Sequence, residues 1–483
     1  MLPETSVVFR TEDKKLQRVY DAAEKKCLLN LKDFGGSTVL VEGGGYEKIW
    51  LETQPMGGEM YALRNLEAAK NNILLFMMHQ RGDGRLPGSI QYLNGRVEPQ
   101  FNKYQGFCFP FPALNLYYLT GRDNEYLEQL KGTLIRFDNC LWKTRHISGD
   151  GLLSSFCIYD TGEDGALRYG DAPCWWEEDA PPKGYQVVPM ASMDVTSWSC
   201  AARRTVAEIC RIQGDAAAGE WEKKSGTAAA ALRRHLWDEQ RGALYDRDRT
   251  GRKIDILCHN TLRSMYWGSV SPDMADRFVK EHLLNPAEFW TPFPLPSVAA
   301  NDPAFRNAPE NNWSGQPEGL TYQRAILALE RYGYHRLVTE LGQKLIDAVD
   351  ANGCRFTQQY DPFTGKASLV RMTDHQPAAE DCGEAVQDAY GPTMLACLEY
   401  IAHHYGIHPH LGQVWFSLGT GKPYEYEAVF YNHRYMIRSD GHTAEIRIDG
   451  KTLGWHCCGR RIATDESGML LRTEPIEKAG EEI

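Results

Sequence analysis

The sequence lacks the features that would place it at once in a membrane, secreted or zinc-binding class. No stretch approaches the length of about 18 uncharged apolar residues that a membrane-spanning helix needs, so we expect none. The N-terminal segment MLPETSVVFRTEDKK has no apolar core of the kind found in signal peptides, which predicts a cytoplasmic protein. The 13 cysteines are scattered and include no CxxC pair, which indicates reduced thiols rather than a disulfide framework or a zinc site.

Positive charge is in deficit as well. The chain carries 53 Lys and Arg against 64 Asp and Glu, a net charge of −11, whereas a protein that binds nucleic acid needs a basic surface. We therefore expect no nucleic-acid partner and no membrane partner. The glycine triplet at 43–45 lacks the GxGxxG spacing of a dinucleotide site, and the histidine pairs at 403–404 and 408–410 lack the HExxH pattern. The sequence thus predicts no cofactor and no metal, although a calcium site stays open.

What the sequence does contain is a repeated helical pattern. Three times an apolar helical segment ends at a glycine and a more amphipathic one follows within a few residues, at 114–137, 199–237 and 322–349. Such pairs are antiparallel hairpins, and their composition suits an inner ring of helices covered by an outer one. Further helices are expected at about 14–31, 58–80, 256–267, 272–284 and 388–405. The predicted fold class is mainly α, an (α/α)6 toroid.

From about residue 412 the pattern changes to short β-type runs. VWFSL, YEYEAVFY, RYMIRS, AEIRID, KTLGWHCC and RRIATD are separated by turns such as SDG and IDG, which predicts a small antiparallel β appendage. We therefore divide the chain into a helical toroid, 1–411, and a β-rich C-terminal appendage, 412–483, that ends in a frayed acidic tail.

Long loops rich in Gly, Pro and aromatic residues separate the helices, and loops of this length are usually functional or disordered. One of them contains the acidic turn DTGEDGALRY, residues 160–169. A carboxyl that is shielded from water, or that lies beside another carboxylate, keeps its proton near neutral pH. Asp164, with Asp160 and Glu163 close by, is therefore a candidate general acid.

The surroundings of this turn suggest its supports. Trp175 and Trp176 follow closely and are placed to shield Asp164, and Arg168 is expected to form a salt bridge with Asp160 that orders the loop. The alternatives are an exposed acidic turn or a cation-binding loop, although the D-x-D-x-D-G spacing of a calcium loop is missing.

Several segments, in order, resemble those of inverting (α/α)6-barrel glycosidases. The group is glycoside hydrolase family 63, with processing α-glucosidase I and the mannosylglycerate and glucosylglycerate hydrolases, and more distantly trehalase. These relatives carry E-S-G-x-D-x-S-P-R-Y, and the turn at 160–169 keeps its Gly, its Asp and its Arg-Tyr pair. The resemblance implies that Asp164 is the general acid and that Asp160, Arg168 and Tyr169 support it. Asp160 replaces the leading Glu, and the Ser-Pro is missing.

The C-terminal motifs of these relatives are also recognisable. Trp313-Ser314-Gly315-Gln316-Pro317 stands where they have W-x-G-P, and QQYDPFTG, 358–365, stands where they have E-x-Y-x-P-x-T-G. The first Glu of the second motif is their general base.

Here that position holds Gln358, and an amide has too little basicity to deprotonate water. Three interpretations remain open. Another carboxylate, Glu318, Glu380 or Glu384, is the base; the protein is a catalytically weak sugar-binding relative; or the chain is an engineered Glu-to-Gln variant that traps substrate.

The loops also collect the side chains that hydroxyl-rich ligands need, namely amides and carboxylates for hydrogen bonds beside aromatic platforms. The predicted substrate-binding residues are Trp50, Glu52, Gln54, His79, Gln80, Arg81, Asp83, Asp160, Arg168, Tyr169, Trp175, Trp176, Trp313, Gly315, Gln316 and Tyr360. Each Trp also fits ordinary core packing, and Glu318 also fits the first turn of a helix.

The predicted function is an inverting, exo-acting glycoside hydrolase for a small α-linked glycoside or oligosaccharide. Inversion requires two carboxyl groups roughly 6.5–9.5 Å apart, with room for a water molecule between them. The alternatives are a sugar-binding protein without activity, or another sugar enzyme of the same fold, such as an epimerase or an unsaturated-uronide hydrolase. The expected partner is a small carbohydrate, and a homo-oligomer is left open.

Overall fold

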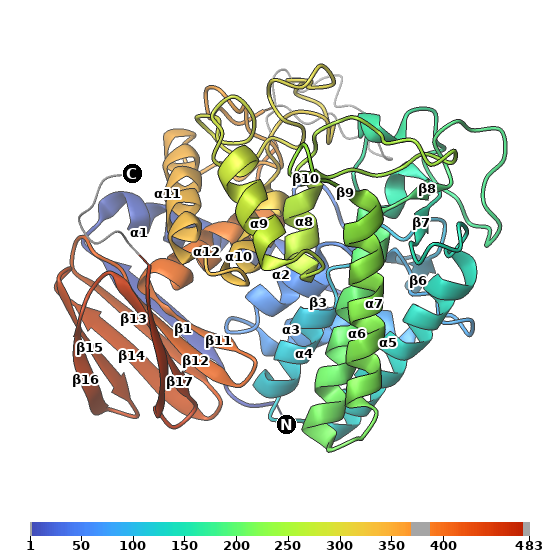
Figure 1. The fold of residues 1–483 in the computed structure, drawn as a ribbon. Coiled ribbons are helices and arrows are strands. Elements are labelled where there is room, and N and C mark those ends of the chain that lie inside the picture. Colours follow the sequence, from blue (N-terminus) through green and yellow to red (C-terminus); the bar gives the residue numbers. More distant parts are fainter. Residues whose placement is uncertain (1, 369–386, 477–483) are drawn as a thin grey trace.

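The computed structural model describes residues 2–368 and 387–476, and in these ranges it contains twelve α-helices and eighteen β-strands (Figure 1). The helices are α1 (Lys14–Cys27), α2 (Gln54–Met60), α3 (Leu66–Met78), α4 (Pro110–Leu119), α5 (Asn124–Thr144), α6 (Met193–Gln213), α7 (Ala218–Leu236), α8 (Asn260–Trp267), α9 (Pro272–Phe278), α10 (Gly319–Glu330), α11 (His335–Ala351) and α12 (Gly391–Tyr405). Single turns of 3₁₀ helix lie at Leu28–Asn30, Ile158–Asp160 and Leu167–Tyr169, and a π-helical turn lies at Val279–Leu283.

The helix ends follow the local chemistry of the sequence. Asp13, Asp123 and Ser192 precede α1, α5 and α6, and each accepts hydrogen bonds from backbone N–H groups of the first turn that have no partner inside the helix. Helices α6 and α8 end at Gly214 and Gly268, both with a φ of 68°, a left-handed conformation that glycine adopts without a Cβ penalty.

The even-numbered helices contact one another in sequence. Helix α2 contacts α4, each later even-numbered helix contacts the next, and α12 contacts α2 again. The odd-numbered helices pack against these even-numbered helices: α7 contacts α6 and α9 contacts α8, α1 contacts α12, and α3, α5 and α11 each contact two of them. All eight residues of α8 are buried, whereas α7 buries only one face. The more apolar member of a pair is thus the one packed on most sides.

The prediction of a single helix over 58–80 is wrong. The chain enters α2 earlier, turns at 61–64, and starts α3 at Leu66, because Asn65 caps that helix with a 2.9 Å hydrogen bond from the backbone N–H of Ala68. The helix expected over 14–31 ends at Cys27, and the one expected over 388–405 begins at Gly391, with Pro392 in its first turn.

The strands form two larger antiparallel sheets and several small ones. The strands are β1 (Ser6–Thr11), β2 (Leu31–Asp33), β3 (Thr38–Leu40), β4 (Ile49–Trp50), β5 (Ser89–Leu93), β6 (Arg96–Gln100), β7 (Ser154–Ser155), β8 (Met190–Ala191), β9 (Trp237–Asp238), β10 (Ala243–Leu244), β11 (Ile407–His410), β12 (Gln413–Leu418), β13 (Tyr424–Phe430), β14 (His433–Ser439), β15 (Thr443–Ile448), β16 (Lys451–Cys457), β17 (Arg460–Asp465) and β18 (Leu470–Pro475). The larger sheets have the orders β1-β13-β14-β15-β16 and β11-β12-β17-β18.

The predicted C-terminal antiparallel strands are confirmed. Each predicted run corresponds to one strand from β12 to β17, and the two sheets contact each other through β11, β12, β13 and β14. The sequence analysis did not anticipate β1, which pairs with β13 from Ser6↔Val429 to Thr11↔Tyr424. The domain boundary at 411 stays a prediction, and β1 and β11 both join sheets of C-terminal strands. The predicted acidic tail lies mainly beyond residue 476, outside the described residues.

The long loops gather at one end of the helices, at the top of Figure 1. The small sheet β4-β5-β6 is built from the segments before α2 and after α3, with Ile49↔Ile90 and Trp50↔Ser89 as register pairs. Among the helices of the described residues, none combines the length and apolar character needed to cross a membrane.

Candidate active site

A pocket of about 330 Å³ lies among these loops. It is lined by Glu42, Gly45, Tyr46, Glu47, Lys48, Trp50, Glu52, Thr53, Gln91, Tyr92, Leu93, Lys103, Gln105, Gly162, Asp164, Asn311, Trp313, Leu320, Gln358 and Tyr390. Binding sites for small molecules have volumes of about 300–1,000 Å³, so the pocket suits a small ligand. Five of the residues singled out from the sequence line it together: Trp50, Glu52, Asp164, Trp313 and Gln358.

Asp164 is held by a clamp between its own loop and the segment 311–314. The backbone N–H of Trp313 donates to the backbone carbonyl of Asp164 (2.9 Å). The hydroxyl of Ser314 accepts a hydrogen bond from the backbone N–H of Leu167 (2.7 Å). Both segments of the clamp come from long loops, which explains how an acidic turn without regular structure acquires a defined position.

A row of hydrogen bonds joins Asp164 to Gln358. The amide of Asn311 donates to Asp164 Oδ2 (2.8 Å) and accepts from Gln358 Nε2 (3.1 Å). The hydroxyl of Tyr46 then donates to Gln358 Oε1 (3.0 Å). The two positions that the family motifs single out therefore both line the pocket, with the side chain of Asn311 between them.

Two tryptophans supply the aromatic surface of the pocket. Trp50 and Trp313 both line it, and both are at least nine-tenths buried. The ammonium groups of Lys48 and Lys103 each lie 5.2 Å from the centroid of the Trp50 ring. Flat rings with polar groups at their edges can stack on a sugar while its hydroxyls find hydrogen-bond partners.

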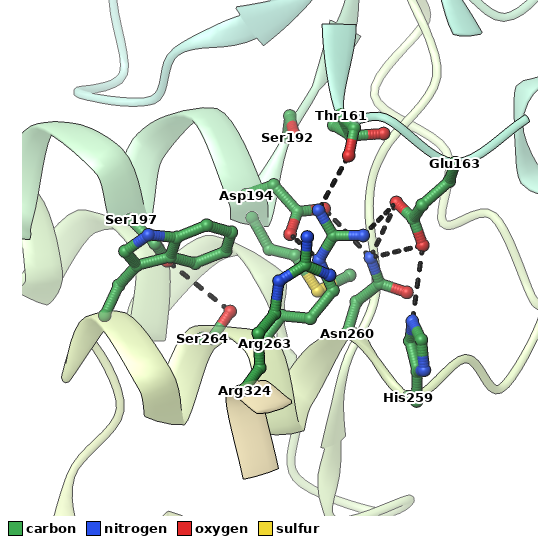
Figure 2. Close-up of polar contacts among 12 residues, drawn as sticks. Thr161, Glu163, Ser192, Asp194, Ser197, His259, Asn260, Arg263, Ser264 and Arg324 are labelled. Atoms are coloured by element: carbon green, nitrogen blue, oxygen red, sulfur yellow. Dashed lines mark hydrogen bonds and ion pairs between the residues drawn. The ribbon is translucent and has the colours of Figure 1, made fainter. Parts of the chain in front are cut away.

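A buried network of charged residues lies next to the pocket (Figure 2). Arg263 forms ion pairs with Glu163 (3.1 Å) and Asp194 (3.0 Å). In Figure 2 the amide of Asn260 lies between the same two carboxylates, with hydrogen bonds of 3.1 and 2.9 Å, and His259 approaches Glu163 from the other side. The charged groups thus have partners of opposite charge that compensate for the loss of water, whereas the amide oxygen of Asn260 has no hydrogen-bond partner among the described residues.

Arg168 completes this network. It binds Glu163, Asp194 (2.8 Å) and Asp246, and all three carboxylates are buried. Burial alone would raise the pKa of Glu163, but Arg168 and Arg263 hold it well below its usual range. Glu163 therefore stays ionised. It anchors the turn through its ion pairs and does not act as a proton donor.

The predicted salt bridge between Arg168 and Asp160 is wrong. Asp160 instead binds Arg145 (2.9 Å) and accepts a hydrogen bond from the backbone N–H of Phe156 (2.8 Å). Proximity in the sequence misled because Arg145 pairs with Asp160, while three other buried carboxylates pair with Arg168. Asp160, Arg168 and Tyr169 are all buried outside the pocket lining.

The two tryptophans expected to shield Asp164 lie elsewhere. Trp175 is 56% exposed, and with Trp176 it lines a separate surface depression. The indole N–H of Trp176 donates to the carbonyl of Ala180 (2.8 Å). The shield around Asp164 is formed by Asn311 and Trp313 instead.

The predicted residues at 79–83 also lie outside the pocket lining. Gln80 donates to the backbone carbonyls of Gly84 (2.8 Å) and Thr133 (3.0 Å), and Arg81 pairs with Asp83 (2.6 Å). These bonds fasten the turn after α3 to α5, which is a structural role. Burial lowers the pKa of the neighbouring His79.

Several other predicted residues lie outside the pocket lining and form hydrogen bonds or close contacts with neighbouring segments. Gln54 accepts a hydrogen bond from the backbone N–H of Trp50 (2.7 Å). Gln316 donates to a neighbouring amide (2.8 Å), and the hydroxyl of Tyr360 donates to a backbone carbonyl (2.9 Å). Gly315 packs so closely against the backbone carbonyl of residue 306 that no Cβ fits there.

Three buried glutamates lie in or next to the pocket: Glu42 and Glu52 line it, and Glu318 lies outside the lining. Burial raises the pKa of Glu52 to about 7 although Arg324 pairs with it, and it raises the pKa of Glu318 well above its usual range. Burial likewise raises the pKa of Glu42 to about 8. Glu318 does not line the pocket and accepts a hydrogen bond from Gln359 (2.7 Å). The other candidates for the base, Glu380 and Glu384, lie outside the described residues.

The sequence alone does not single out Glu42. It follows β3 in the segment VEGGGY, where no periodicity or motif singles it out. The glycine triplet beside it was considered only as a dinucleotide motif. The surroundings of Glu42 come from residues far along the chain, Tyr390 and Gly391, which form hydrogen bonds with it.

One cluster of described residues has the composition of a metal site. Glu330, His403 and His408 lie together at the opposite end of α10 from the pocket. Arg461 is 2.6 Å from Glu330, and the rings of the two histidines stack with centroids 3.7 Å apart. Arginine already neutralises the carboxylate, and stacked rings do not direct their nitrogen lone pairs at one ion.

Residues 58–378 match the family model of the mannosylglycerate hydrolase MGH1-like glycoside hydrolase domain. The chain belongs to this family. The resemblance to glycoside hydrolase family 63 inferred from the motifs is thereby confirmed. The comparison with curated proteins gave no match.

Three solved structures illustrate the similarity of fold. The family 63 mannosylglycerate hydrolase from Thermus thermophilus is 16% identical, with a TM-score of 0.61, over 79% of this chain and 99% of that chain. Neutral trehalase from Saccharomyces cerevisiae is 13% identical, with a TM-score of 0.58, over 76% and 74%. A structure described as a sialidase is 12% identical, with a TM-score of 0.71, over 96% of this chain and 42% of that chain. At these identities the likeness concerns the fold alone.

Proposed function

We propose that this glycosidase-family protein is an inverting, exo-acting hydrolase of a small α-linked glycoside or oligosaccharide, with Asp164 as the general acid. The observation that carries the proposal is the position of Asp164 in a pocket that also contains Trp50, Trp313 and Gln358. Asp164 would donate its proton to the glycosidic oxygen as the bond to the anomeric carbon breaks. A pocket of about 330 Å³ favours a terminal sugar over the interior of a long polymer.

The fold and the arrangement of the pocket support this proposal. The contacts that run through the even-numbered helices and return to α2 form the pattern expected of an (α/α)6 toroid. The hydrogen bonds of 2.8 and 3.1 Å on either side of Asn311 keep Asp164 close to Gln358, the motif position of the base.

The test is hydrolysis of a panel of α- and β-linked disaccharides and nitrophenyl glycosides, with the product anomer followed by proton NMR. We expect turnover of at least one α-glycoside with release of the β-anomer. Asp164→Asn should lower kcat by about 10²- to 10⁴-fold, the usual contribution of a general acid. Retention of configuration, or full activity of the variant, would exclude the proposed mechanism.

A second candidate function is that of a sugar-binding protein without activity, and the amide at Gln358 favours it. Gln358→Glu separates the two. A large gain in turnover would indicate that the present chain lacks its base, whereas equal activity in both proteins, abolished by Asp164→Asn, would place the base at another residue. Sugar binding in calorimetry without turnover in either protein would establish the binding function.

A further inference from the structure

The pocket needs a second carboxylate, because inversion requires a base that takes a proton from water. The inference that follows rests on the proposed function. Gln358 is an amide and cannot fill this role, although it stands at the motif position of the base. The described carboxylates that line the pocket are Glu42, Glu47, Glu52 and Asp164.

Two of these carboxylates form ion pairs with basic side chains. Glu52 forms an ion pair with Arg324, and it also lies against Gly162 and Gly106. Glu47 is exposed at the rim and pairs with Lys32 (3.3 Å). Glu318, the buried glutamate behind Gln358, is not among the residues that line the pocket, and it accepts a hydrogen bond from Gln359 (2.7 Å).

Glu42 has neither of these constraints. It is 7% exposed and lines the pocket, and its carboxylate accepts a hydrogen bond from the hydroxyl of Tyr390 (2.9 Å). Its backbone is fixed at both ends of the residue: its N–H donates to the carbonyl of Lys48 (3.2 Å), and its carbonyl accepts from the N–H of Gly391 (2.7 Å). A neutral phenol thus orients the group on a rigid backbone.

Glu42 belongs to the wall that also holds Gln358. The side chain of Gln387 bridges the two segments, since it donates to the carbonyl of Gly44 (2.7 Å) and accepts from the backbone N–H of Gln358 (2.8 Å). Gly43 forms a β-bridge with Tyr390. The base is thus expected on the side of the pocket where Glu42 is found.

We infer that Glu42 is the general base of this glycosidase and replaces the carboxylate that Gln358 lacks. The Glu42 carboxylate takes a proton from a water molecule while the water oxygen bonds to the anomeric carbon. The glycosidic bond breaks at the same time, and its oxygen leaves as an alcohol with the proton of Asp164. The step ends with Glu42 protonated, Asp164 ionised and the sugar released with inverted configuration. Glu42 precedes the residues matched to the family model, 58–378.

The charge environment agrees with this role. Burial raises the pKa of Glu42 to about 8; the Tyr390 hydrogen bond and Arg324 lower it, and Glu52 and Asp164 raise it. A base works best when its pKa lies near the operating pH, so the ionised Glu42 carboxylate is a stronger base than an ordinary glutamate, and most of it is ionised only above about pH 8. The assignment of Glu42 as the base rests on geometry, because Glu42 and the acid Asp164 line the same pocket.

The test compares three variants, Glu42→Gln, Glu59→Gln and Glu318→Gln, on a glycoside that the unmodified protein hydrolyses. Glu42→Gln should lower kcat by about 10²- to 10⁴-fold. Sodium azide, a nucleophile that needs no base, should restore turnover and give the glycosyl azide of inverted configuration. The α-glycosyl fluoride, which needs little help from an acid, should restore Asp164→Asn and leave Glu42→Gln slow.

Glu59→Gln is the matched control, because burial raises the pKa of Glu59 to about 8 as well, yet Glu59 lies outside the pocket lining. It should keep the unmodified rate. Tyr390→Phe keeps the carboxylate and should cost only about 5-fold through loss of one hydrogen bond. Thermal unfolding of each variant separates misfolding from lost chemistry.

The inference is overturned if Glu42→Gln keeps more than about a tenth of the rate, well short of a typical base effect. It is also overturned if Glu318→Gln loses activity while Glu42→Gln does not, or if the fluoride rather than azide restores Glu42→Gln. If the unmodified protein hydrolyses no glycoside at all, the proposed function itself fails, which is a separate outcome.

Discussion

Replacing Arg168 by methionine tests whether the buried network holds the active-site loops in place. The side chain of Arg168 is 3% exposed and binds Glu163, Asp194 and Asp246. In Arg168→Met, Glu163 and Asp194 keep their bonds to Arg263. Asp246 is left with the backbone N–H of Met193 (2.8 Å) as its hydrogen-bond donor, so the variant contains a buried carboxylate without its cation.

The magnitude follows from this loss. Removing one partner of a buried ion pair costs about 3–5 kcal/mol, because the other charge is left without compensation. Unfolding entropy of about 2.1 cal/mol/K per residue gives about 1 kcal/mol/K for 483 residues, so the melting temperature should fall by about 3–5 °C at pH 8. Burial raises the pKa of Asp246 to about 6 even with Arg168 present, and the pKa rises further without it.

The sign of the pH dependence follows from that shift. A carboxyl whose folded-state pKa is raised destabilises the fold above that pKa, and the penalty disappears as the group takes up a proton. The difference in melting temperature between variant and unmodified protein should therefore narrow from pH 8 to pH 5, measured by differential scanning calorimetry. Arg211→Met is the control, since Arg211 also pairs with two carboxylates but is 43% exposed, and such pairs contribute about 0–1 kcal/mol. Equal shifts in the two variants, or a gap that widens at pH 5, would refute the reasoning.

Three further changes follow: two test parts of the site, and the third tests the Glu330–His403 pair at the other end of α10. Gly162→Ala forces a left-handed φ of 73° on a residue with a Cβ, at about 1–2 kcal/mol, and drives that Cβ into Glu52; melting temperature and kcat/KM should both fall, and an unchanged kcat/KM would contradict the packing. Ser314→Ala removes a clamp hydrogen bond worth about 1 kcal/mol, so kcat should fall roughly 5-fold with KM nearly constant; a change in KM alone would place Ser314 in substrate binding instead. Burial would lower the pKa of His403, but Glu330 raises it to about 9, so the stability from this pair is complete below about pH 6.5 and is lost as the pH rises through 9; urea unfolding of His403→Gln should show its largest deficit at pH 6 and none by pH 10.

The helices and the C-terminal strands could be predicted because their signals are local. A glycine after an apolar segment, or alternation over a few residues, acts within one turn or one strand. The exceptions have local causes too: Asn65 divides the helix expected over 58–80, because its side chain satisfies the first N–H groups of α3. By contrast β1 is found only through its partner β13, which stands more than 400 residues later in the chain.

The partners within the acidic turn could not be predicted for a different reason. Sequence distance suggested that Arg168 pairs with Asp160, but several carboxylates compete for each arginine in this core. Arg145 occupies Asp160, and Arg168 turns to Asp194 and Asp246, which stand 26 and 78 residues away. The choice among partners of equal charge depends on the three-dimensional packing of loops.

Glu42, the base that we infer, could not be predicted from the sequence for the same reason. Its hydrogen-bond partner Tyr390 is 348 residues away, and nothing in the segment VEGGGY distinguishes this glutamate from an exposed one. A motif compares each position with its counterpart in relatives, so at residue 358 it can report only that a carboxylate is missing. A pocket is filled from many segments, however, and a carboxylate that enters from another segment satisfies the same chemical requirement. The loss at Gln358 and the presence of Glu42 in the same wall are therefore best understood together, as one requirement met from a different part of the chain.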